Sequence, residues 1–372
     1  MQSEYAKAGV DYTKIEPFKD AMIATAKRTV GFPEARQVFI NTSVLHSHGG
    51  IFRYRGNHEH AWCNTMEGLG NKNWIAEWMY QFDGTGNPHY RGIGIDNAMM
   101  AVNDCIAQGA MPVAYVDEVA AGDSEWFQDV RRAEDLAEGF YEACKMSDMA
   151  LVAGESPALK YLVRAQEPVT SAPSLSGCVT GIIAPLDNLI DGSKLATGDR
   201  IIGITSSGLH ANGVSLVIKR ALELPDKFLT KLPGGKTLGE EALIPTRCYV
   251  RLVEALLENR VDIHALLPGT GSGVAKVAFD HRPHTYRIHS WPKVPPLFRF
   301  MQELGVSDRD CVTTFNWGVG YYVFVPAHEV DRTLAVAKAA GYGALEVGHV
   351  ETGERKTIFG PMSDMVLEPP GE

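Results

Sequence analysis

The sequence predicts a two-domain α/β protein, on three observations. The chain has 372 residues, which is more than one hydrophobic core usually serves. Segments that read as strand, glycine-rich turn and helix recur in both halves, as is typical of α/β proteins. A polar, turn-rich connection at 185–199 separates the halves. We therefore predict domains at 1–184 and 185–372.

Composition narrows the function classes. With 45% hydrophobic and 22% charged residues, the chain resembles an ordinary soluble globular protein. Its net charge of -10 argues against general binding of nucleic acid, although ATP can still bind locally with Mg²⁺. The six cysteines are scattered without CxxC spacing, and no apolar run approaches the length of a membrane span. We expect a cytoplasmic protein with no nucleic-acid and no membrane partner.

The first 72 residues contain one clear helix and one glycine loop. The pattern predicts an amphipathic helix over 15–30, ended by a Gly-Phe-Pro turn. His46 and His48 follow in a glycine-rich loop, as metal ligands or simply as polar loop residues. A strand from 61 then enters a loop with Gly68 and Gly70, where the backbone can approach a ligand, and Lys72 can meet phosphate charge.

The stretch 91–117 reads as a short turn, a helix and a buried strand. Asp96, Asn103 and Asp104 lie on neighbouring helical faces, with Asp117 on the strand, so a buried helix can present oxygen ligands. The alternative is that Asp96 caps the helix and Asp104 is a solvated surface residue. A helix over 124–146 and a strand over 148–155 follow. Glu155 ends that strand, as a metal or catalytic group or as a solvated turn residue.

After a strand over 175–183 and the polar connection, the second half opens with a strand, a Gly/Ser turn and a helix over 200–219. Backbone N–H groups in such a turn point at an anion. His210 and Asn212 in this turn either contact substrate or simply neighbour the helix cap. The remaining pattern predicts helices near 245–259 and 328–341, a glycine turn at 267–275, and strands ending at 325 and 353.

Seven segments stand in the order, and at the distances, of one known family: 5–11, 94–110, 190–194, 198–199, 206–213, 245–250 and 314–320. The last reads Thr314-Phe-Asn-Trp-Gly-Val-Gly320. Together they resemble phosphoribosylformylglycinamidine cyclo-ligase, also called AIR synthetase. Because seven ordered matches are far more specific than one loop, the chain is identified as a member of this family over nearly its whole length.

The resemblance implies an α/β (α+β), two-domain AIR-synthetase-like fold. The N-terminal sheet would form a barrel across a homodimer, and a C-terminal α/β domain would follow. It also implies a ligase of purine biosynthesis that binds ATP and Mg²⁺. In the family's reaction, ATP converts the formyl amide oxygen of formylglycinamidine ribonucleotide into a phosphate. An internal nitrogen attacks, and phosphate leaves as the ring of aminoimidazole ribonucleotide closes. The implied partners are a small-molecule ribonucleotide and a second copy of the chain.

The resemblance further assigns roles to side chains. The implied cofactor-binding residues are Gly68, Gly70, Lys72, Asp96, Asn103, Asp104 and Glu155. The implied metal ligands are Glu67, Asp96, Asp104 and Glu155. Mg²⁺ suits such a set because it takes carboxylate and phosphate oxygens together. His210 and Asn212 are implied to lie toward the substrate as catalytic residues.

Three active-site loops depart from the family. Glu67 stands where the family has Asp, Ser156 begins a loop that replaces a Glu-Met-Pro-Gly turn, and the loop 267–273 lacks the family's histidine. His264 and His281 are nearby candidates to replace it. Two alternatives therefore stay open: an ATP-dependent paralogue acting on another amide or phosphate acceptor, and a non-catalytic nucleotide-binding homodimer. The sequence does not fix the direct metal ligands or the catalytic base.

Overall fold

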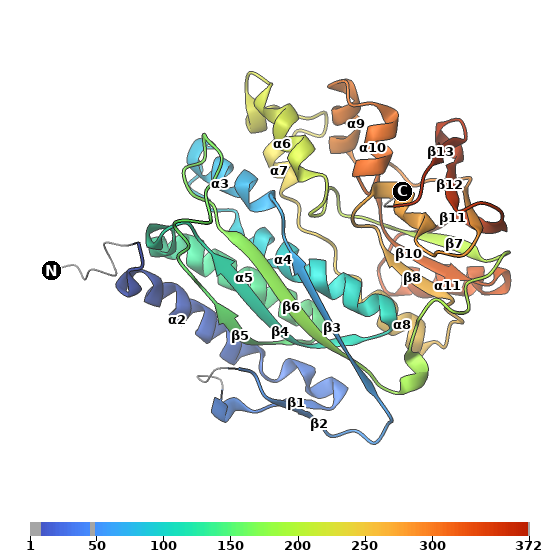
Figure 1. The fold of residues 1–372 in the computed structure, drawn as a ribbon, viewed down its shortest axis with the longest axis horizontal. Coiled ribbons are helices and arrows are strands. Elements are labelled where there is room, and N and C mark those ends of the chain that lie inside the picture. Colours follow the sequence, from blue (N-terminus) through green and yellow to red (C-terminus); the bar gives the residue numbers. More distant parts are fainter. Residues whose placement is uncertain (1–8, 45–48, 371–372) are drawn as a thin grey trace. The chain divides into compact units, whose positions relative to one another are not determined.

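The computed structural model describes residues 9–44 and 49–370, so His46, His48 and the start of the first matched segment lie outside it. The chain forms two compact units (Figure 1). One runs up to Cys105 and resumes at Ala110–Leu186; the other joins Ile106–Gly109 to the chain from Asp187 onward. Both contain sheets and helices, which confirms the predicted α/β class. Compactness does not test independent folding, so 1–184 and 185–372 stay predicted domains.

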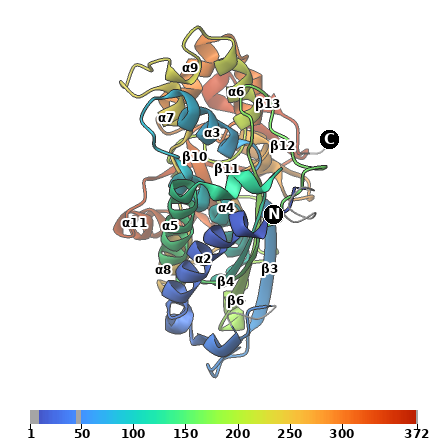
Figure 2. The same ribbon diagram turned by 90° about the vertical axis from the view of Figure 1, so that its left-hand side faces the viewer.

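The first unit is built on a four-stranded sheet in the order β3-β6-β4-β5. Its strands are β3 (Ala61–Gly68), β6 (Ser174–Ile183), β4 (Met111–Ala120) and β5 (Ala150–Glu155). Only β4 and β5 pair in parallel. Helices cover one face, as the edge-on view in Figure 2 shows: α2 (Tyr12–Thr29), α4 (Tyr90–Cys105) and α5 (Val130–Ser147). The side chains on this face therefore meet α4, whereas those on the other face do not.

Helix α4 packs on α5 with almost no side chain between them. A Cβ on Gly94 would lie 2.8 Å from the carbonyl oxygen of Leu136, and a Cβ on Gly139 would overlap the carbonyl oxygen of Arg91. Glycine at both positions lets the two backbones touch. Nearly every residue of α4 is buried, which is the pattern of a core helix rather than a surface helix.

The opposite face of this sheet is only partly covered. Strands β1 (Val38–Ile40) and β2 (Phe52–Tyr54) pair with each other and pack over part of it. Trp62 and Met66 of β3 stay 40% and 66% exposed. Within residues 9–44 and 49–370 the strands close no barrel. The barrel across a homodimer therefore stays a prediction, for which this open apolar surface is available.

The second unit contains a seven-stranded sheet in the order β13-β12-β9-β11-β7-β10-β8. Its strands are β7 (Arg200–Thr205), β8 (Ala265–Pro268), β9 (His284–Ile288), β10 (Val319–Val325), β11 (Ala344–Thr352), β12 (Lys356–Phe359) and β13 (Met365–Leu367). The helices are α6 (Val214–Leu222), α7 (Leu238–Ala242), α8 (Val250–Glu258), α9 (Pro296–Glu303), α10 (Asp308–Thr314) and α11 (Val330–Ala339). Strand β10 lies between β7 and the edge strand β8 and is buried along its whole length.

The predicted elements correspond to observed ones, but one of them is divided, and the structure contains others that were not predicted, such as α9, α10, β12 and β13. The helix predicted over 124–146 is divided because Asp129 caps a new helix by accepting a hydrogen bond from the Arg132 N–H at 3.1 Å. Helix α3 (Lys72–Phe82) was not predicted, since it follows the glycine loop directly and its preceding residue makes no side-chain cap. Across the described part of the chain, no helix is both long and apolar enough to cross a membrane.

A buried glutamate fixes α3 against its neighbours. Glu77 is 1% exposed and accepts hydrogen bonds from Tyr90 Oη at 2.7 Å, Trp126 Nε1 at 2.6 Å and Arg132 Nη2 at 3.1 Å. These donors come from α4, from the 3₁₀ turn Ser124–Gln128 and from α5. One carboxylate thus joins four segments.

Replacing Glu77→Gln should lower the free energy of unfolding by about 3 kcal/mol, because it removes the buried carboxylate 3.0 Å from the largely buried Arg132 guanidinium and leaves it only the more distant Asp129, at 3.8 Å. Urea unfolding followed by tryptophan fluorescence measures the change. Glu142→Gln is the matched control, since it removes the same charge from the exposed pair with Arg91 and should change stability by roughly 0.5 kcal/mol or less. Equal losses in the two variants would contradict a structural role for Glu77.

Candidate functional site

A buried ion pair lies where the glycine loop enters α3. Lys72 is the first residue of α3, and its Nζ lies 3.0 Å from Oδ1 and 2.8 Å from Oδ2 of Asp96 in α4. Neither side chain is exposed at all. Burial lowers the pKa of Lys72, and the carboxylate of Asp96 opposes that shift. Each charge makes burial of the other tolerable.

A second set of polar side chains lies on the sheet face that α4 covers. Glu67 of β3 and Asp117 of β4 both stand opposite Gly177 of β6, so their side chains share one face, about 10 Å apart. Tyr115, two residues before Asp117, accepts a hydrogen bond from Asn97 Nδ2 of α4 at 3.1 Å. This contact identifies the face as the one toward α4. A Cβ on Gly177 would overlap the Tyr115 hydroxyl, so glycine provides its space.

Asp117 is a buried carboxylate that the sequence-based site did not include. It is 6% exposed, and a Cβ on the adjacent Gly154 would lie 2.5 Å from its Oδ1. Burial raises the pKa of Asp117 to about 7, and the charge of Glu155 adds to the rise. Among the described residues, neither Oδ1 of Asp117 nor Oδ1 of Asn97 accepts a hydrogen bond. Two buried hard oxygen atoms, one of them on the residue that follows Asp96, thus have no hydrogen-bond donor among the described residues.

The other residues predicted for the nucleotide site are spread more widely. Gly68 ends β3, and Gly70 turns the chain into α3 with φ of 76°. Asn103 and Asp104 lie about two helical turns, roughly 10–12 Å, beyond Asp96 along α4. Glu155 is exposed at the end of β5, and its Oε1 accepts a hydrogen bond from the N–H of Ser156 at 3.0 Å.

The predicted metal ligands are not gathered into one cluster. In residues 9–44 and 49–370, no group of three or more His, Cys, Asp or Glu side chains is placed to hold a metal ion. Mg²⁺ commonly takes only one or two carboxylates from the protein and completes its shell with phosphate oxygens and water. The assignments of Glu67, Asp96, Asp104 and Glu155 therefore stay predictions. Glu67 directly precedes Gly68 of the glycine loop, and Asp96 contacts Lys72 at the end of that loop.

In the second unit, one asparagine fixes the loop that contains both predicted catalytic residues. Asn316 is 5% exposed, and its Nδ2 donates to the carbonyl oxygen of Gly208 at 2.7 Å. Its Oδ1 accepts from the N–H of Gly318 at 2.9 Å. His210, which is 1% exposed with φ of 56°, and the half-buried Asn212 lie in this loop between β7 and α6. The matched segments 206–213 and 314–320 therefore form one assembly.

Further hydrogen bonds bring two more loops to the same place. Ser207 Oγ donates to the carbonyl oxygen of Pro245 at 2.6 Å, and the N–H of Gly269 donates to the carbonyl oxygen of Gly320 at 2.9 Å. The ring of Tyr249 lies 6.3 Å from that of His210. The sequence assigned no role to Asn316 or Tyr249, although both lie in matched segments, because their partners are distant along the chain.

The two candidates to replace the family's missing histidine, His264 and His281, lie outside the loops that Asn316 holds together. His264 Nδ1 lies 2.8 Å from Asp199 Oδ2, and its Nε2 lies 3.4 Å from Asp262 Oδ2. Both ring nitrogens thus face carboxylates at the start of β8. His281 is exposed. Neither is among the residues that the Asn316 assembly brings together.

Comparison with known proteins agrees with this two-unit geometry. Residues 48–183 match the family model described as AIR synthase related protein, N-terminal domain, and residues 196–360 match that of the C-terminal domain. The chain belongs to the AIR synthase related family. The resemblance inferred from the seven segments is thereby confirmed.

Curated members of the AIR synthase related family match nearly the whole chain. The phosphoribosylformylglycinamidine cyclo-ligase of Desulfotalea psychrophila is 33% identical over 379 residues, covering 96% of this chain and 97% of that protein. The cyclo-ligase of Lactobacillus acidophilus is 32% identical over 360 residues, covering 93% and 95%.

Solved structures share the fold at lower identity. The hydrogenase maturation protein HypE in complex with ATP has a TM-score of 0.60 at 16% identity, covering 89% of this chain and 91% of that chain. Thiamine-monophosphate kinase from Stenotrophomonas maltophilia has a TM-score of 0.58 at 17% identity, covering 88% and 93%. These likenesses support the AIR-synthetase-like fold.

The raised pKa of Asp117 predicts a pH-dependent stability for the unliganded protein. A carboxyl whose pKa is higher folded than unfolded stabilises the fold at low pH, and this stabilisation is lost as pH rises through about 7. Asp117→Asn should therefore stabilise the protein by about 2 kcal/mol more at pH 8 than at pH 5. Urea unfolding in EDTA without nucleotide measures this difference. A variant whose effect is the same at both pH values would exclude a buried, titrating Asp117.

Proposed function

We propose that the protein catalyses the ATP-dependent ring closure of formylglycinamidine ribonucleotide to aminoimidazole ribonucleotide, through a phosphorylated amide, in purine biosynthesis. The main support is the similarity to cyclo-ligases, at 32–33% identity over 93–96% of the chain. That similarity extends through both units. The cytoplasmic location and a homodimer joined through the open face of β3 belong to the same proposal.

For ATP and Mg²⁺, the proposal rests on the polar residues around the glycine loop. Lys72 supplies a positive charge for phosphate oxygens, and Asp96 and Glu67 supply carboxylates for the metal. The buried oxygens of Asn97 and Asp117 fit this donor set, since a hard cation prefers oxygen ligands. Bound Mg²⁺ would neutralise phosphate charge during transfer. One solved protein of this fold is itself in complex with ATP.

For the ribonucleotide, the proposal rests on the Asn316 assembly. His210 can donate or accept a proton, and Asn212 has both an amide donor and an acceptor. Its buried Oδ1 accepts no hydrogen bond among the described residues. Asn316 holds the backbone of Gly208 and acts as a positioning residue for this loop. Water exclusion by the surrounding buried side chains would strengthen each polar contact.

Release of ADP tests the reaction directly. The purified protein should release ADP from Mg²⁺-ATP at least tenfold faster with formylglycinamidine ribonucleotide than with ATP alone, because the amide oxygen of this substrate accepts the phosphoryl group and leaves ADP. A coupled ADP assay measures both rates, and mass spectrometry identifies the product. Folded protein that shows no stimulation by this substrate would refute the cyclo-ligase. Stimulation of ADP release by another amide or phosphate acceptor would indicate the divergent paralogue. ATP binding without any turnover would indicate the non-catalytic homodimer.

The role of Asp96 is tested by comparing ATP with and without metal. Asp96→Asn should reduce the affinity advantage of Mg²⁺-ATP over metal-free ATP at least tenfold, since the neutral amide is a weaker Mg²⁺ ligand. Titration calorimetry below the unfolding range measures both affinities. The comparison cancels the stability loss expected from leaving Lys72 buried without its partner.

Asp104→Asn is the matched control for this measurement, because Asp104 carries the same group two turns along the same helix. An equal loss in both variants would assign metal binding to both carboxylates. An unchanged advantage in Asp96→Asn would remove Asp96 from the metal site.

A further inference from the structure

Two cysteines meet between the edge of the first unit's sheet and the helix that covers it. Cys63 lies in β3, the edge strand of the described sheet, and Cys105 is the last residue of α4. Cys63 stands opposite Gly181 of β6, and a Cβ on Gly181 would lie 2.5 Å from Cys105 Sγ. Directly opposite residues of antiparallel strands point to the same face, with Cβ positions about 5 Å apart. The space that Gly181 leaves therefore holds the sulfur of Cys105 beside the side chain of Cys63.

A hydrogen bond between the two thiols makes them unequal. Cys105 donates to Cys63, and this bond lowers the pKa of Cys63 to about 6 against the effect of its partial burial. The hydroxyl of Thr65, 3.7 Å from Cys63 Sγ, also lowers it. The same bond, together with complete burial, raises the pKa of Cys105 well above its usual range. At neutral pH Cys63 is thus mainly a half-buried thiolate beside a protonated thiol.

Other cysteines have different surroundings. Cys178 of β6 stands opposite Met66, so it points to the open face of the sheet, and partial burial raises its pKa. Cys144 and Cys311 are both fully buried, and burial raises the pKa of each thiol. A buried thiol with a raised pKa reacts slowly, because the thiolate is the nucleophile. Cys63 therefore combines thiolate character, partial exposure and an adjacent second thiol.

We propose that Cys63 and Cys105 are a peroxide-sensitive thiol pair that oxidises to a disulfide. The Cys63 thiolate attacks one oxygen of hydrogen peroxide, the O–O bond breaks, and the other oxygen leaves as hydroxide and takes up a proton to become water. The sulfur of Cys105 then attacks the sulfenic sulfur of Cys63. The Cys105 proton goes to the departing hydroxyl group, which leaves as a second water. Two thiols and one peroxide thus give one disulfide and two waters, with sulfur oxidised and peroxide oxygen reduced.

The surroundings favour both steps. Sulfenic acid formation removes the negative charge on Cys63, which is one cause of the raised pKa of Cys105, so the second thiol is activated after the first has reacted. The sulfurs must then approach to about 2.05 Å. In the described sheet β3 pairs with β6 alone, so β3 can shift without disturbing a second strand. The disulfide would join the strand of Glu67 to the helix of Asp96, and oxidation would constrain both elements.

Peptide mapping of the native protein tests the pair. Folded, reduced protein is treated with hydrogen peroxide, unfolded in excess iodoacetamide to block the remaining thiols, and digested without reductant. We expect the main disulfide-linked product to join the Cys63 and Cys105 peptides, with a mass two hydrogens below their sum, and to disappear with dithiothreitol. Absence of this product, or a main link from Cys63 to another cysteine, would refute the proposal. No nucleotide or substrate is present, so the result is independent of the cyclo-ligase activity.

Cys178→Ser is the matched control, because it removes a half-buried cysteine from the neighbouring strand on the opposite face. The yield of the Cys63–Cys105 link should be unchanged in this variant, whereas Cys63→Ser should leave Cys105 reduced. In the native protein at pH 7, iodoacetamide should modify Cys63 at least tenfold faster than Cys178, since Cys63 has the larger thiolate fraction. Loss of the link in Cys178→Ser, a Cys105 disulfide in Cys63→Ser, or equal labelling rates would each overturn the assignment.

Discussion

The ion pair between Lys72 and Asp96 is the interaction on which the first unit's candidate site depends. Neither charge reaches solvent, so each is tolerated only while the other stays within about 3 Å. This requirement fixes the start of α3 against the middle of α4 and therefore sets where the glycine loop before Lys72 must end. Glu77, one and a half turns further along α3, fixes the same helix a second time through donors from three other segments.

Both units use a buried asparagine for a related purpose. Asn97 Nδ2 links α4 to Tyr115 and to the carbonyl oxygen of Ser176, while Asn316 Nδ2 links its turn to the loop of His210. A carboxamide can donate and accept at once without a net charge, so it joins backbone segments where a buried carboxylate would need a cation. These asparagines thus fix backbone positions with neutral groups, in addition to the positions that the Lys72–Asp96 pair and Glu77 fix with charged ones.

The sequence predicted most of the helices and strands that residue patterns indicate. It did not predict the contacts between residues that are far apart along the chain. The α4–β4 stretch was predicted from its apolar residues and the strand that follows, whereas α3 follows a glycine loop directly and the residue before it makes no side-chain cap. Lys72 and Asp96 were each predicted, but their contact spans 24 positions. Asp117 lies on the same sheet face as Glu67 only because of its strand register with Gly177 and Gly154. Asn316 contacts a loop 108 positions away. The spacing of residues in the sequence does not show which of these distant positions come into contact.

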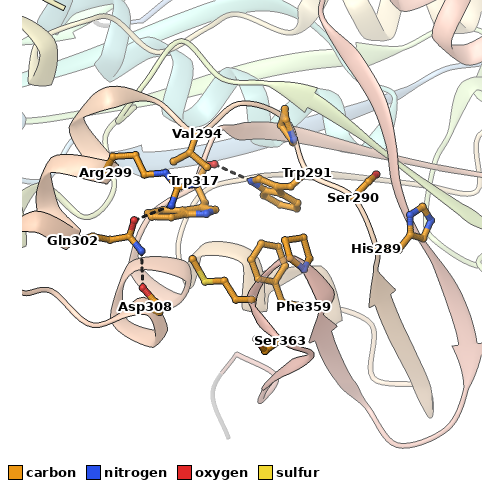
Figure 3. Close-up of a pocket in the computed structure, with 13 residues that line it drawn as sticks. His289, Ser290, Trp291, Val294, Arg299, Gln302, Asp308, Trp317, Phe359 and Ser363 are labelled. Atoms are coloured by element: carbon orange, nitrogen blue, oxygen red, sulfur yellow. Dashed lines mark hydrogen bonds between the residues drawn. The ribbon is translucent and has the colours of Figure 1, made fainter. Parts of the chain in front are cut away.

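The turn at Asn316 and Trp317 shows how adjacent residues serve two different surfaces. Trp317 has φ of 54° and Gly318 has φ of 108°, so the backbone reverses. Asn316 faces the His210 loop, while Trp317 is buried against α9, beside the hollow that Trp291 and Arg299 also line (Figure 3). A left-handed backbone disfavours a bulky side chain by roughly 1–2 kcal/mol, and glycine or asparagine would adopt it more easily. The turn itself therefore gives no reason for tryptophan. Its stacking on Phe298 and the overlying Arg299, 5.3 Å from its ring, offset the strain, and this packing of a ring that is 1% exposed is the structural reason for the indole.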